Sequence, residues 1–531
     1  MAPDRTPRGH PGSHFGIGRT VAVIGAGIGG VSAAAYLLKE GLSVTVFERS
    51  GVGGGIWHFD ERIPEDPPYP SQRPSLGDYQ VSQRGEFASP TPPPEPFVDD
   101  NDSRVDALDS NPKGDSNLEV RFAPPGPCYA GLKNNIPTSV LVSSLGPWPE
   151  GTEQNISQEL AEKYIQGLAT EHGVTAVTQL HTRVDEVKTT PDGAKWEVRT
   201  VSLEKLHGSA QLKERLWCFD LVVVATGHYC TPRIPDFRGL KQLKTAFPGR
   251  IIHSKQYRRP QQFQGQNVLV IGAGVSSSDI CRELVGIANK VYQSVRGGMY
   301  DTPVHLLPDS TLRVGGIEEF RLLKDSSIAG EQHLAPGQPI PGQVVLKDGE
   351  VLDDIHYVVL ATGYITSYPF LSHLHSDDAN LDEAGEHVLI TSDGDMVHNL
   401  HKDIFYIPNP TLAFIGVPYH AAAFTLFGFQ AQVLARVFSG KAHLPARGEM
   451  VEEYREKVKE KELGRSFHSL AGPGAEVEYV KNLVDWVNED GDVLGEPQIS
   501  AHAEEWVKEY EAFKTRLTEA WFGKKSEKLE L

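Results

Sequence analysis

The amino-acid sequence predicts an α/β fold built from two Rossmann-like dinucleotide-binding domains, one inserted in the other. Two separate segments each show a short strand rich in Val and Ile, followed by a glycine-rich turn, a helix and a second strand. A further apolar strand ends in Ala-Thr-Gly before the second segment, at 225–227, and again after it, at 361–363. The chain has 531 residues, which is too long for one compact core and suits two or three domains.

The first segment begins at residues 20–24, a short apolar run that predicts a strand. An Ala-rich helix is expected over about 29–40, where Gly41 ends it, and 42–48 is expected to form a second strand. The order of strand, helix and strand predicts a βαβ unit.

The turn between this strand and this helix carries Gly25, Gly27 and Gly30 in the pattern G-x-G-x-x-G. The first glycine permits the tight turn, the second lets the backbone approach a pyrophosphate, and the third lets the helix pack closely on the strand. The helix N-terminus then offers free N–H groups and a positive dipole to the pyrophosphate. Glu48 lies 23 positions after Gly25 and can bind ribose hydroxyls. We therefore predict FAD at this turn, the alternative being the glycines of an ordinary βα turn.

The second segment predicts a strand at 267–271, a helix at about 276–287 and a strand at 290–295. Its turn carries Gly272 and Gly274, with Ser277 in the third glycine position. A small residue there still allows the helix to pack closely on the strand. We expect Gly272, Gly274 and Ser276 to contact a second dinucleotide.

The charge at the end of the second strand differs between the two segments. Counting 23 positions from Gly272 leads to Val295, so the acid found at Glu48 is missing, and Arg296 follows. An acid there would repel a 2′-phosphate, whereas an arginine can pair with it. We therefore predict NADPH rather than NADH, the alternative being that Arg296 is a solvated cation. Two nested dinucleotide sites imply electron transfer between cofactors that carry the redox chemistry themselves.

The remaining pattern sets the domain boundaries. We expect a helix over 158–172, strands over 180–187, 196–201, 221–225 and 357–361, and helices over most of the C-terminal part, including 450–463. The stretch 59–122 is dense in Pro, Ser, Asp and Asn and predicts a long, partly disordered surface insertion. The predicted domains are a disordered tail at 1–19, a first part of the FAD domain at 20–230, an NADP domain at 231–355, and a second part of the FAD domain with C-terminal helices at 356–531.

Composition argues against several classes of protein. The net charge of −19 argues against general binding to nucleic acid or anionic membranes. The four cysteines form no C-x-x-C pair and lie near no His cluster with metal-ligand spacing, so we expect neither a metal site nor a disulfide framework. The N-terminus lacks the apolar run of a signal peptide, and no stretch of about 20 apolar residues could form a transmembrane helix. We predict a soluble, cytoplasmic protein.

The segment Phe247–Tyr257, between the two glycine turns, matches the pattern F-x-G-x-x-x-H-x-x-x-Y. With this motif the chain resembles the class B flavin-containing monooxygenases that oxidise nitrogen and sulfur. Further matching pieces are Gly54-Gly55-Ile56-Trp57, Asn134-Asn135-Ile136-Pro137, Ala225-Thr226-Gly227, Ala361-Thr362-Gly363-Tyr364 and Leu412-Ala413-Phe414-Ile415-Gly416. The likeness covers about 21–444, and the long insertion makes the chain more similar to fungal members, which often serve secondary-metabolite pathways.

The resemblance implies a reaction and its residues. NADPH reduces the flavin, oxygen adds to flavin C4a, and the resulting C4a-hydroperoxyflavin oxygenates a soft nucleophile, the sulfur or nitrogen of a small molecule. The family's flavin-facing asparagine maps to Asn135, our candidate catalytic residue, although an Asn before Ile-Pro is also a normal turn residue. Gly55, Trp57 and Thr226 are expected at the cofactors, where Trp57 either packs against the flavin or fills the core beside it.

The linker motif and the cysteine spacing also help to distinguish alternative functions. His253 and Tyr257 are expected to organise the linker between the domains and not to act as acid–base catalysts. The related Baeyer–Villiger enzymes, which oxidise ketones, typically have Trp at the last motif position, followed by Pro or Asp, whereas this chain has Tyr257 and Arg258. A disulfide reductase would need a redox dithiol, and neither C-x-x-C nor C-x-x-x-x-C occurs. A flavoprotein that oxidises NADPH without oxygen transfer is a further alternative.

The expected partners follow from this reaction. They are a small-molecule nucleophile and O2, without nucleic acid. The oligomeric state stays open, with a homodimer as the candidate assembly.

Overall fold

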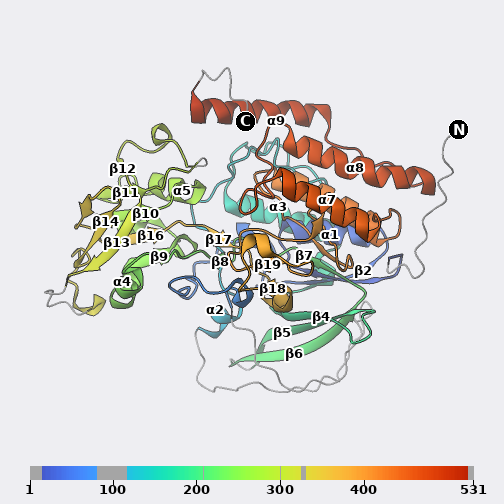
Figure 1. The fold of residues 1–531 in the computed structure, drawn as a ribbon, viewed down its shortest axis with the longest axis horizontal. Coiled ribbons are helices and arrows are strands. Elements are labelled where there is room, and N and C mark those ends of the chain that lie inside the picture. The colour runs from blue at the N-terminus through green and yellow to red at the C-terminus, as the bar shows by residue number, and fades with distance from the viewer. Residues whose placement is uncertain (1–14, 80–116, 207–208, 299–300, 324–329, 524–531) are drawn as a thin grey trace.

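The computed structural model describes residues 15–79, 117–206, 209–298, 301–323 and 330–523. Figure 1 shows two lobes side by side: a smaller lobe with α4, α5 and the strands around β10, and a larger lobe that holds both the first βαβ unit and the C-terminal helices α7 and α8. The chain therefore leaves the larger lobe, builds the smaller one and returns. The tail at 1–14 and the central part of the insertion, 80–116, lie outside the described residues.

A seven-stranded sheet forms the core of the larger lobe, in the order β20-β21-β22-β7-β1-β2-β3. Strand β1 (Thr20–Ile24) lies between β2 (Ser43–Phe47) and β7 (Leu221–Val224) and pairs in parallel with both. The other strands are β3 (Thr178–Gln179), β20 (Leu400–His401), β21 (Phe405–Tyr406) and β22 (Leu412–Phe414). Because both faces of this sheet are covered, its central strands carry apolar residues without polar alternation.

Helix α1 (Ile28–Lys39) covers one face of this sheet together with α6 (Ala423–Phe438). The alanines at 33–35 are buried in this layer, and their small side chains allow a close approach between α1 and its neighbours. Helix α8 (Ala475–Leu494) packs on the outer side of α6. The first glycine turn is thus fixed by a rigid layer of helices.

The other face is covered by an antiparallel sheet of β4 (Thr182–Thr189), β5 (Trp196–Leu206) and β6 (Ser209–Phe219). Trp196, Trp217 and Phe219 pack against Ala22 and Ile24 of β1 in one apolar cluster. Burial of these large aromatic groups is a major source of stability for the larger lobe.

The smaller lobe is built on a second parallel sheet in the order β12-β11-β10-β16-β9. These strands are β9 (Ile251–His253), β10 (Asn267–Ile271), β11 (Lys290–Ser294), β12 (Thr311–Val314) and β16 (Tyr357–Leu360). An antiparallel sheet of β13 (Ile317–Leu322), β14 (Gly342–Leu346) and β15 (Val351–Leu352) and the helices α4 (Leu240–Ala246) and α5 (Val275–Glu283) complete it.

Strand β16 corrects one predicted boundary. It pairs with β10 and β9, so the second sheet continues past residue 355, where we ended the NADP domain. A fully buried Val-rich strand carries no sign of which of two parallel sheets it joins, so the pattern alone could not assign it.

Short ribbons and the outer helices complete the described chain. Strand β8 (Thr231–Pro232) pairs with β17 (Tyr364–Ile365) where the chain enters and leaves the smaller lobe, and β18 (His375–Ser376) pairs with β19 (Ile390–Thr391). The remaining helices are α2 (Leu118–Phe122), α3 (Gln158–Glu171), α7 (Arg447–Glu460) and α9 (Glu504–Phe522). Among the described residues, no helix is both long and apolar enough to cross a membrane.

Candidate functional site

The first glycine turn has the geometry of a phosphate cradle. Gly25 has a φ of +105°, and a Cβ there would lie 2.7 Å from the carbonyl oxygen of Ala225. A Cβ on Gly30 would lie 1.8 Å from the oxygen of Gly25, so only glycine lets α1 pack here. Helix α1 begins directly after Gly27 with no acid in its first turn, which leaves its N-terminus open to an anion. The residues present therefore fit a bound pyrophosphate.

Glu48 follows strand β2 and turns back toward this cradle. Its carboxylate accepts hydrogen bonds from the backbone N–H groups of Ala26 and Ser50, each at 2.9 Å. The Ser50 hydroxyl donates to the same oxygen, Oε1, as the Ser50 N–H, also at 2.9 Å, so Oε2, which accepts only from Ala26, keeps a lone pair for a ribose hydroxyl. The geometry suits the ribose contact expected of Glu48.

The turn Gly54–Gly55 closes over the cradle. A Cβ on Gly55 would lie 2.9 Å from the Cα of Gly27, so the two backbones are in contact. Trp57 ends the short helix that follows (Gly55–Trp57) and meets the ring of Phe424 edge-on at 6.1 Å. Trp57 is half-buried in a cluster beneath α1 and α3, so it packs beside the first cradle.

The second glycine turn repeats the first. Gly272 has a φ of +119°, and a Cβ there would lie 2.3 Å from the carbonyl oxygen of Ala361. Around Gly274 there is open space, and Ser276 is exposed at the N-terminus of α5. Ser277 is buried and its hydroxyl donates to the carbonyl oxygen of Gly272 at 2.6 Å. The serine thus closes the turn by a hydrogen bond where Gly30 closes the first by direct packing.

Arg296 lies just beyond the end of β11, next to this turn. Its side chain is exposed and forms no hydrogen bond or ion pair within the described parts of the chain. An exposed guanidinium beside a phosphate cradle is available to a 2′-phosphate. The geometry fits NADPH.

The two Ala-Thr-Gly turns meet between the lobes. Thr226 follows β7 directly, and a Cβ on Gly25 would come within 3.4 Å of its Cα. Tyr229, three residues on, contacts Tyr364 of the second Ala-Thr-Gly turn, with ring centroids 5.5 Å apart. Tyr229 is 45% exposed, and partial desolvation raises the pKa of its hydroxyl. Burial likewise lowers the pKa of His228 to about 4.

These aromatic residues were missed from the sequence. Their position in the sequence could have identified them, because each lies shortly after the end of a parallel strand. Polar groups directly after the carboxyl ends of parallel strands in α/β sheets commonly line ligand sites. The pairing of Tyr229 with Tyr364 depends on how two separate sheets meet, which no local pattern encodes.

The linker motif is itself fixed by hydrogen bonds. His253 is fully buried; its Nε2–H donates to the oxygen of Gly363 at 3.0 Å, and its Nδ1 accepts from the N–H of Lys255 at 3.1 Å. The Tyr257 hydroxyl donates to Glu283 at 2.6 Å. These contacts leave His253 neither accessible nor free to exchange a proton with a ligand.

A buried ion cluster ties the linker to the first cradle. Asp78 accepts from Arg49 at 2.9 Å and from Lys255 at 2.8 Å. Burial by itself would raise the pKa of Asp78, but the charges of Arg49 and Lys255 outweigh it and hold the pKa well below its usual range. Because Arg49 follows Glu48, this cluster joins the predicted ribose-binding end of β2 to the linker.

Buried neutral histidines predict acid sensitivity. Burial lowers the pKa of His253 to about 3 and that of His398 to about 4, against about 6.5 in an unfolded chain. Between about pH 6.5 and 4 the unfolded chain therefore binds more protons, so the free energy of unfolding falls as pH falls, by about 1.4 kcal/mol per pH unit for each histidine. We expect the urea midpoint to be constant above pH 7 and to drop steeply from pH 6.5 to 4.5. His398→Asn should reduce that slope, and a flat profile in this window would contradict the prediction.

Asn135 lies in a loop of the larger lobe whose shape depends on its neighbour. Asn134 is buried; its amide donates to the carbonyls of Ile136 and Gln154, each at 2.7 Å, and it accepts from the N–H of Ile156 at 2.6 Å. Asn135 is exposed and makes no hydrogen bond within the described chain. The first asparagine thus shapes the turn and leaves the second free for a ligand.

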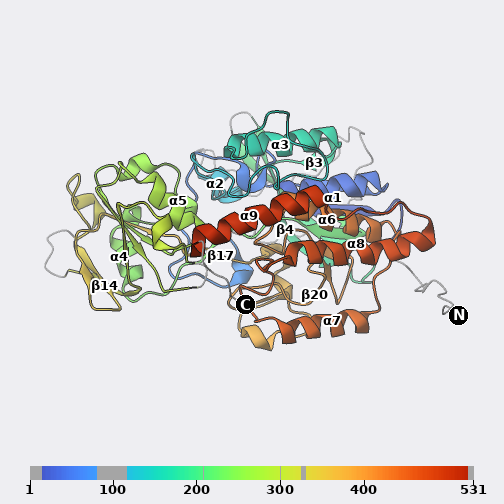
Figure 2. The same cartoon turned by 90° about the horizontal axis from the view of Figure 1, so that it is seen from above.

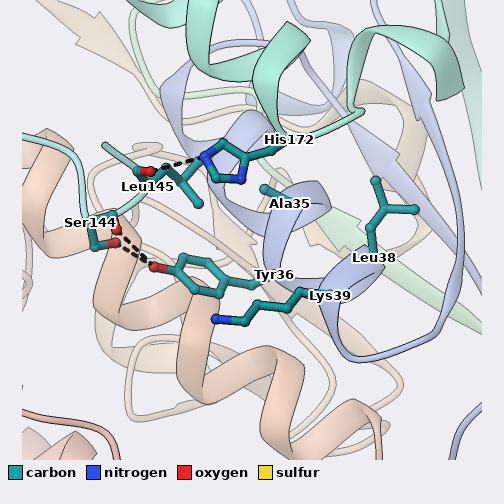
Figure 3. A pocket seen from close by; sticks show the side chains of 7 residues that line it. All are labelled: Ala35, Tyr36, Leu38, Lys39, Ser144, Leu145 and His172. Carbon is teal, nitrogen blue, oxygen red and sulfur yellow. Dashed lines mark hydrogen bonds between the residues drawn. The ribbon is translucent and has the colours of Figure 1, made fainter. Parts of the chain in front are cut away.

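Figure 3 shows a pocket of about 420 Å³ lined by Ala35, Tyr36, Leu38, Lys39, Ser144, Leu145 and His172. It lies at the C-terminal end of α1, whereas Gly27 lies at the N-terminal end. The Tyr36 hydroxyl donates across it to Ser144 Oγ at 2.9 Å. The helix end there is the negative one, which disfavours a phosphate, so this pocket is separate from the cofactor sites.

Comparisons with known proteins agree with these features. A family model described as flavin-binding monooxygenase-like matches residues 129–302 and 340–495, and one described as an NAD(P)-binding Rossmann-like domain matches 23–70. The chain is 38% identical to flavin-containing monooxygenase ustF2 of Aspergillus flavus, over 93% of this chain and 97% of that one. It is 30% identical to flavin-containing monooxygenase iboF of Amanita muscaria, over 88% of each chain. Its fold is similar to that of S-allyl-L-cysteine S-oxygenase from Allium sativum, with a TM-score of 0.62, 23% identity, and 95% and 94% of the two chains covered.

Proposed function

The chain belongs to the flavin-binding monooxygenase-like family, and on this premise we propose that it transfers oxygen to a soft sulfur or nitrogen atom of a small molecule. It is a monooxygenase that uses FAD and NADPH. The observation that carries the proposal is Asn135, exposed in a loop of the larger lobe, together with the absence of C-x-x-C and C-x-x-x-x-C from the sequence.

Each cofactor has its own residues. We assign FAD to Gly25, Gly27, Gly30 and Glu48, with Gly55, Trp57 and Thr226 around that cradle, and NADPH to Gly272, Gly274, Ser276 and Arg296. When bound, the flavin reduced by NADPH supplies the activation of O2. The protein's own part is to bind both dinucleotides and to fix the linker through the hydrogen bonds of His253 and Lys255.

Sulfur or nitrogen is favoured over a ketone carbon. The support is the linker sequence, with Arg258 after Tyr257, and the similarity of fold to an enzyme that by its name oxygenates the sulfur of S-allyl-L-cysteine. We also propose a role in secondary-metabolite biosynthesis, in line with the similarity to fungal chains. A cytoplasmic location and a homodimer complete the proposal; light scattering of the purified holoenzyme tests the homodimer.

A substrate panel tests the function. The purified holoenzyme is incubated with NADPH and 18O2 and with matched thioethers, thiols, amines and ketones, and products are detected by mass. We expect one labelled oxygen atom in a sulfur or nitrogen compound. Lactones or esters from ketones alone would support the Baeyer–Villiger alternative, and NADPH consumption with only hydrogen peroxide would support an oxidase.

Asn135 is expected to control whether NADPH oxidation leads to product. Asn135→Ala removes the amide donor that we assign to the reacting oxygen, and loss of such a donor typically costs about 10²-fold in rate. We expect NADPH consumption to continue while product per NADPH falls at least about tenfold and hydrogen peroxide replaces the product. The matched control is Asn155→Ala, an exposed asparagine in a nearby loop. Equal product per NADPH in both variants would show that Asn135 is only a turn residue.

A further inference from the structure

Helix α9 (Glu504–Phe522) contacts both lobes of the protein. In Figure 2 it runs from the larger lobe beside α6 and α8 toward the smaller lobe near α5. Its 19 residues span about 28 Å at a rise of 1.5 Å per residue. The match to the family model ends at residue 495, so α9 lies beyond it.

The first part of α9 holds the loop of Asn135. Trp506 donates its indole N–H to the carbonyl oxygen of Val140 at 3.0 Å. Trp506 and Tyr510 also pack with Val140 and with Ile136, the residue directly after Asn135, in one apolar cluster. Helix α9 therefore contacts the segment that directly follows Asn135.

The last part of α9 reaches the NADP side. The Nε2 of His305 donates to the carbonyl oxygen of Ala520 at 2.7 Å. His305 follows shortly after Thr302, whose N–H donates to the oxygen of Ala273 at 2.8 Å. Ala273 lies inside the second glycine turn. Two hydrogen bonds, that of His305 with Ala520 and that of Thr302 with Ala273, therefore connect the end of α9 with the NADPH cradle.

We propose that α9 is a brace that fixes the Asn135 loop relative to the NADP domain, with Trp506 and His305 as positioning residues. The proposal rests on the function proposed above, in which Asn135 acts at the first cofactor. A helix transmits position along its length because its backbone hydrogen bonds leave it little freedom to bend. A shift of about 1 Å in a catalytic group can cost about 10²-fold in rate, so such a brace would control the yield of product.

Two substitutions at opposite ends of α9 test the brace. Trp506→Phe keeps an aromatic ring but removes the donor to Val140, and His305→Ala removes the contact with Ala520. The matched control is Leu517→Ala, on an exposed side chain of the same helix. The first readout is hydrogen exchange at the amides of Val140 and Leu141, which both donate to the oxygen of Pro137, measured on the FAD-loaded protein without NADPH. The second readout is product formed per NADPH consumed.

We expect exchange at these two amides to be about tenfold faster in Trp506→Phe and also faster in His305→Ala, with a threefold or larger fall in product per NADPH for each. The contacts with Trp506 and Ala520 are 14 residues apart on the helix, or about 21 Å. Unconnected sites at such a distance combine additively within about twofold. A brace predicts that the double variant loses no more product per NADPH than either single variant.

Several outcomes would overturn the brace. One is that Trp506→Phe matches Leu517→Ala in both readouts, and another is that the two substitutions combine additively. If Trp506→Phe fails to retain FAD, the test is the rate of hydrogen exchange at the Val140 amide in His305→Ala. A rate equal to that of the unsubstituted protein overturns the proposal. If Asn135→Ala leaves product per NADPH unchanged, the role of Asn135 fails by itself, while the exchange data still decide whether α9 holds the loop.

Discussion

Gly272→Ala should abolish most NADPH-driven flavin reduction while leaving FAD bound, and Gly25→Ala should lose FAD while still binding NADPH. Each glycine has a left-handed φ, and a methyl group at either would meet the carbonyl oxygen of the alanine that begins an Ala-Thr-Gly turn, at 2.3 Å for Gly272 and 2.7 Å for Gly25. Such a backbone conformation costs a non-glycine residue about 1–3 kcal/mol, before the steric clash is added. We expect at least a tenfold rise in KM for NADPH in Gly272→Ala and loss of most FAD from Gly25→Ala.

Visible absorbance of the purified variants reports FAD, and rapid mixing with NADPH reports reduction. The control is Gly448→Ala on α7, where an added methyl group meets nothing within 4 Å. Gly274→Ala distinguishes a loss of NADPH binding caused by backbone strain from one caused by a clash with the ligand. The added methyl group there meets no protein atom within 4 Å but occupies the space expected for phosphate. If Gly25→Ala and Gly272→Ala lost the same cofactor, the assignment of one dinucleotide to each turn would be wrong.

Arg296→Ala should weaken NADPH about 10- to 150-fold and leave NADH nearly unchanged. The side chain is exposed at the end of β11 and makes no bond within the described chain, so its removal should not disturb the fold. Hydrogen bonds to charged groups contribute about 1.5–3 kcal/mol, and each 1.4 kcal/mol is a tenfold change in affinity. The measurement is KM and the rate of flavin reduction with each nucleotide.

Arg238→Ala is the matched control, because Arg238 is an exposed arginine of the same lobe that pairs with Glu319. Arg296→Glu should be worse than Arg296→Ala for NADPH only, because it places a negative charge beside the 2′-phosphate. Equal losses of affinity for NADPH and NADH would show that Arg296 does not bind the 2′-phosphate. The preference for NADPH over NADH of the protein with Arg296 intact should also fall as salt rises, since exposed charges are screened.

The sequence predicted those parts of the fold that are encoded locally. Strands β1 and β10 begin and end where the pattern placed them, because each is a short apolar run closed by the glycines of its own turn. Strand β6 was not predicted, because it pairs only with β5 and its central residues are charged, so its strand character comes from the pairing. The assignment of β16 to the second sheet likewise depended on tertiary pairing.

The candidate site likewise contains residues that a local pattern predicts and residues that only tertiary contacts bring together. The glycines, Glu48 and Arg296 could be proposed from spacing alone, because the chemistry of a dinucleotide fixes their order along a βαβ unit. The division of labour between Asn134 and Asn135 could not, since two adjacent identical residues differ only in which side chain the loop buries. The meeting of Tyr229 with Tyr364 and the contacts of α9 join segments more than one hundred residues apart, and no periodicity records them.

The paired strands β8 and β17 set the mechanics of the connection between the lobes. Thr231 and Pro232 lie opposite Ile365 and Tyr364, so the outgoing and the returning chain form one hydrogen-bonded ribbon. A single tether would let the smaller lobe swivel freely, whereas a two-stranded ribbon flexes across its flat face and resists torsion. We therefore expect the ribbon to favour opening and closing of the smaller lobe over torsion about the connection.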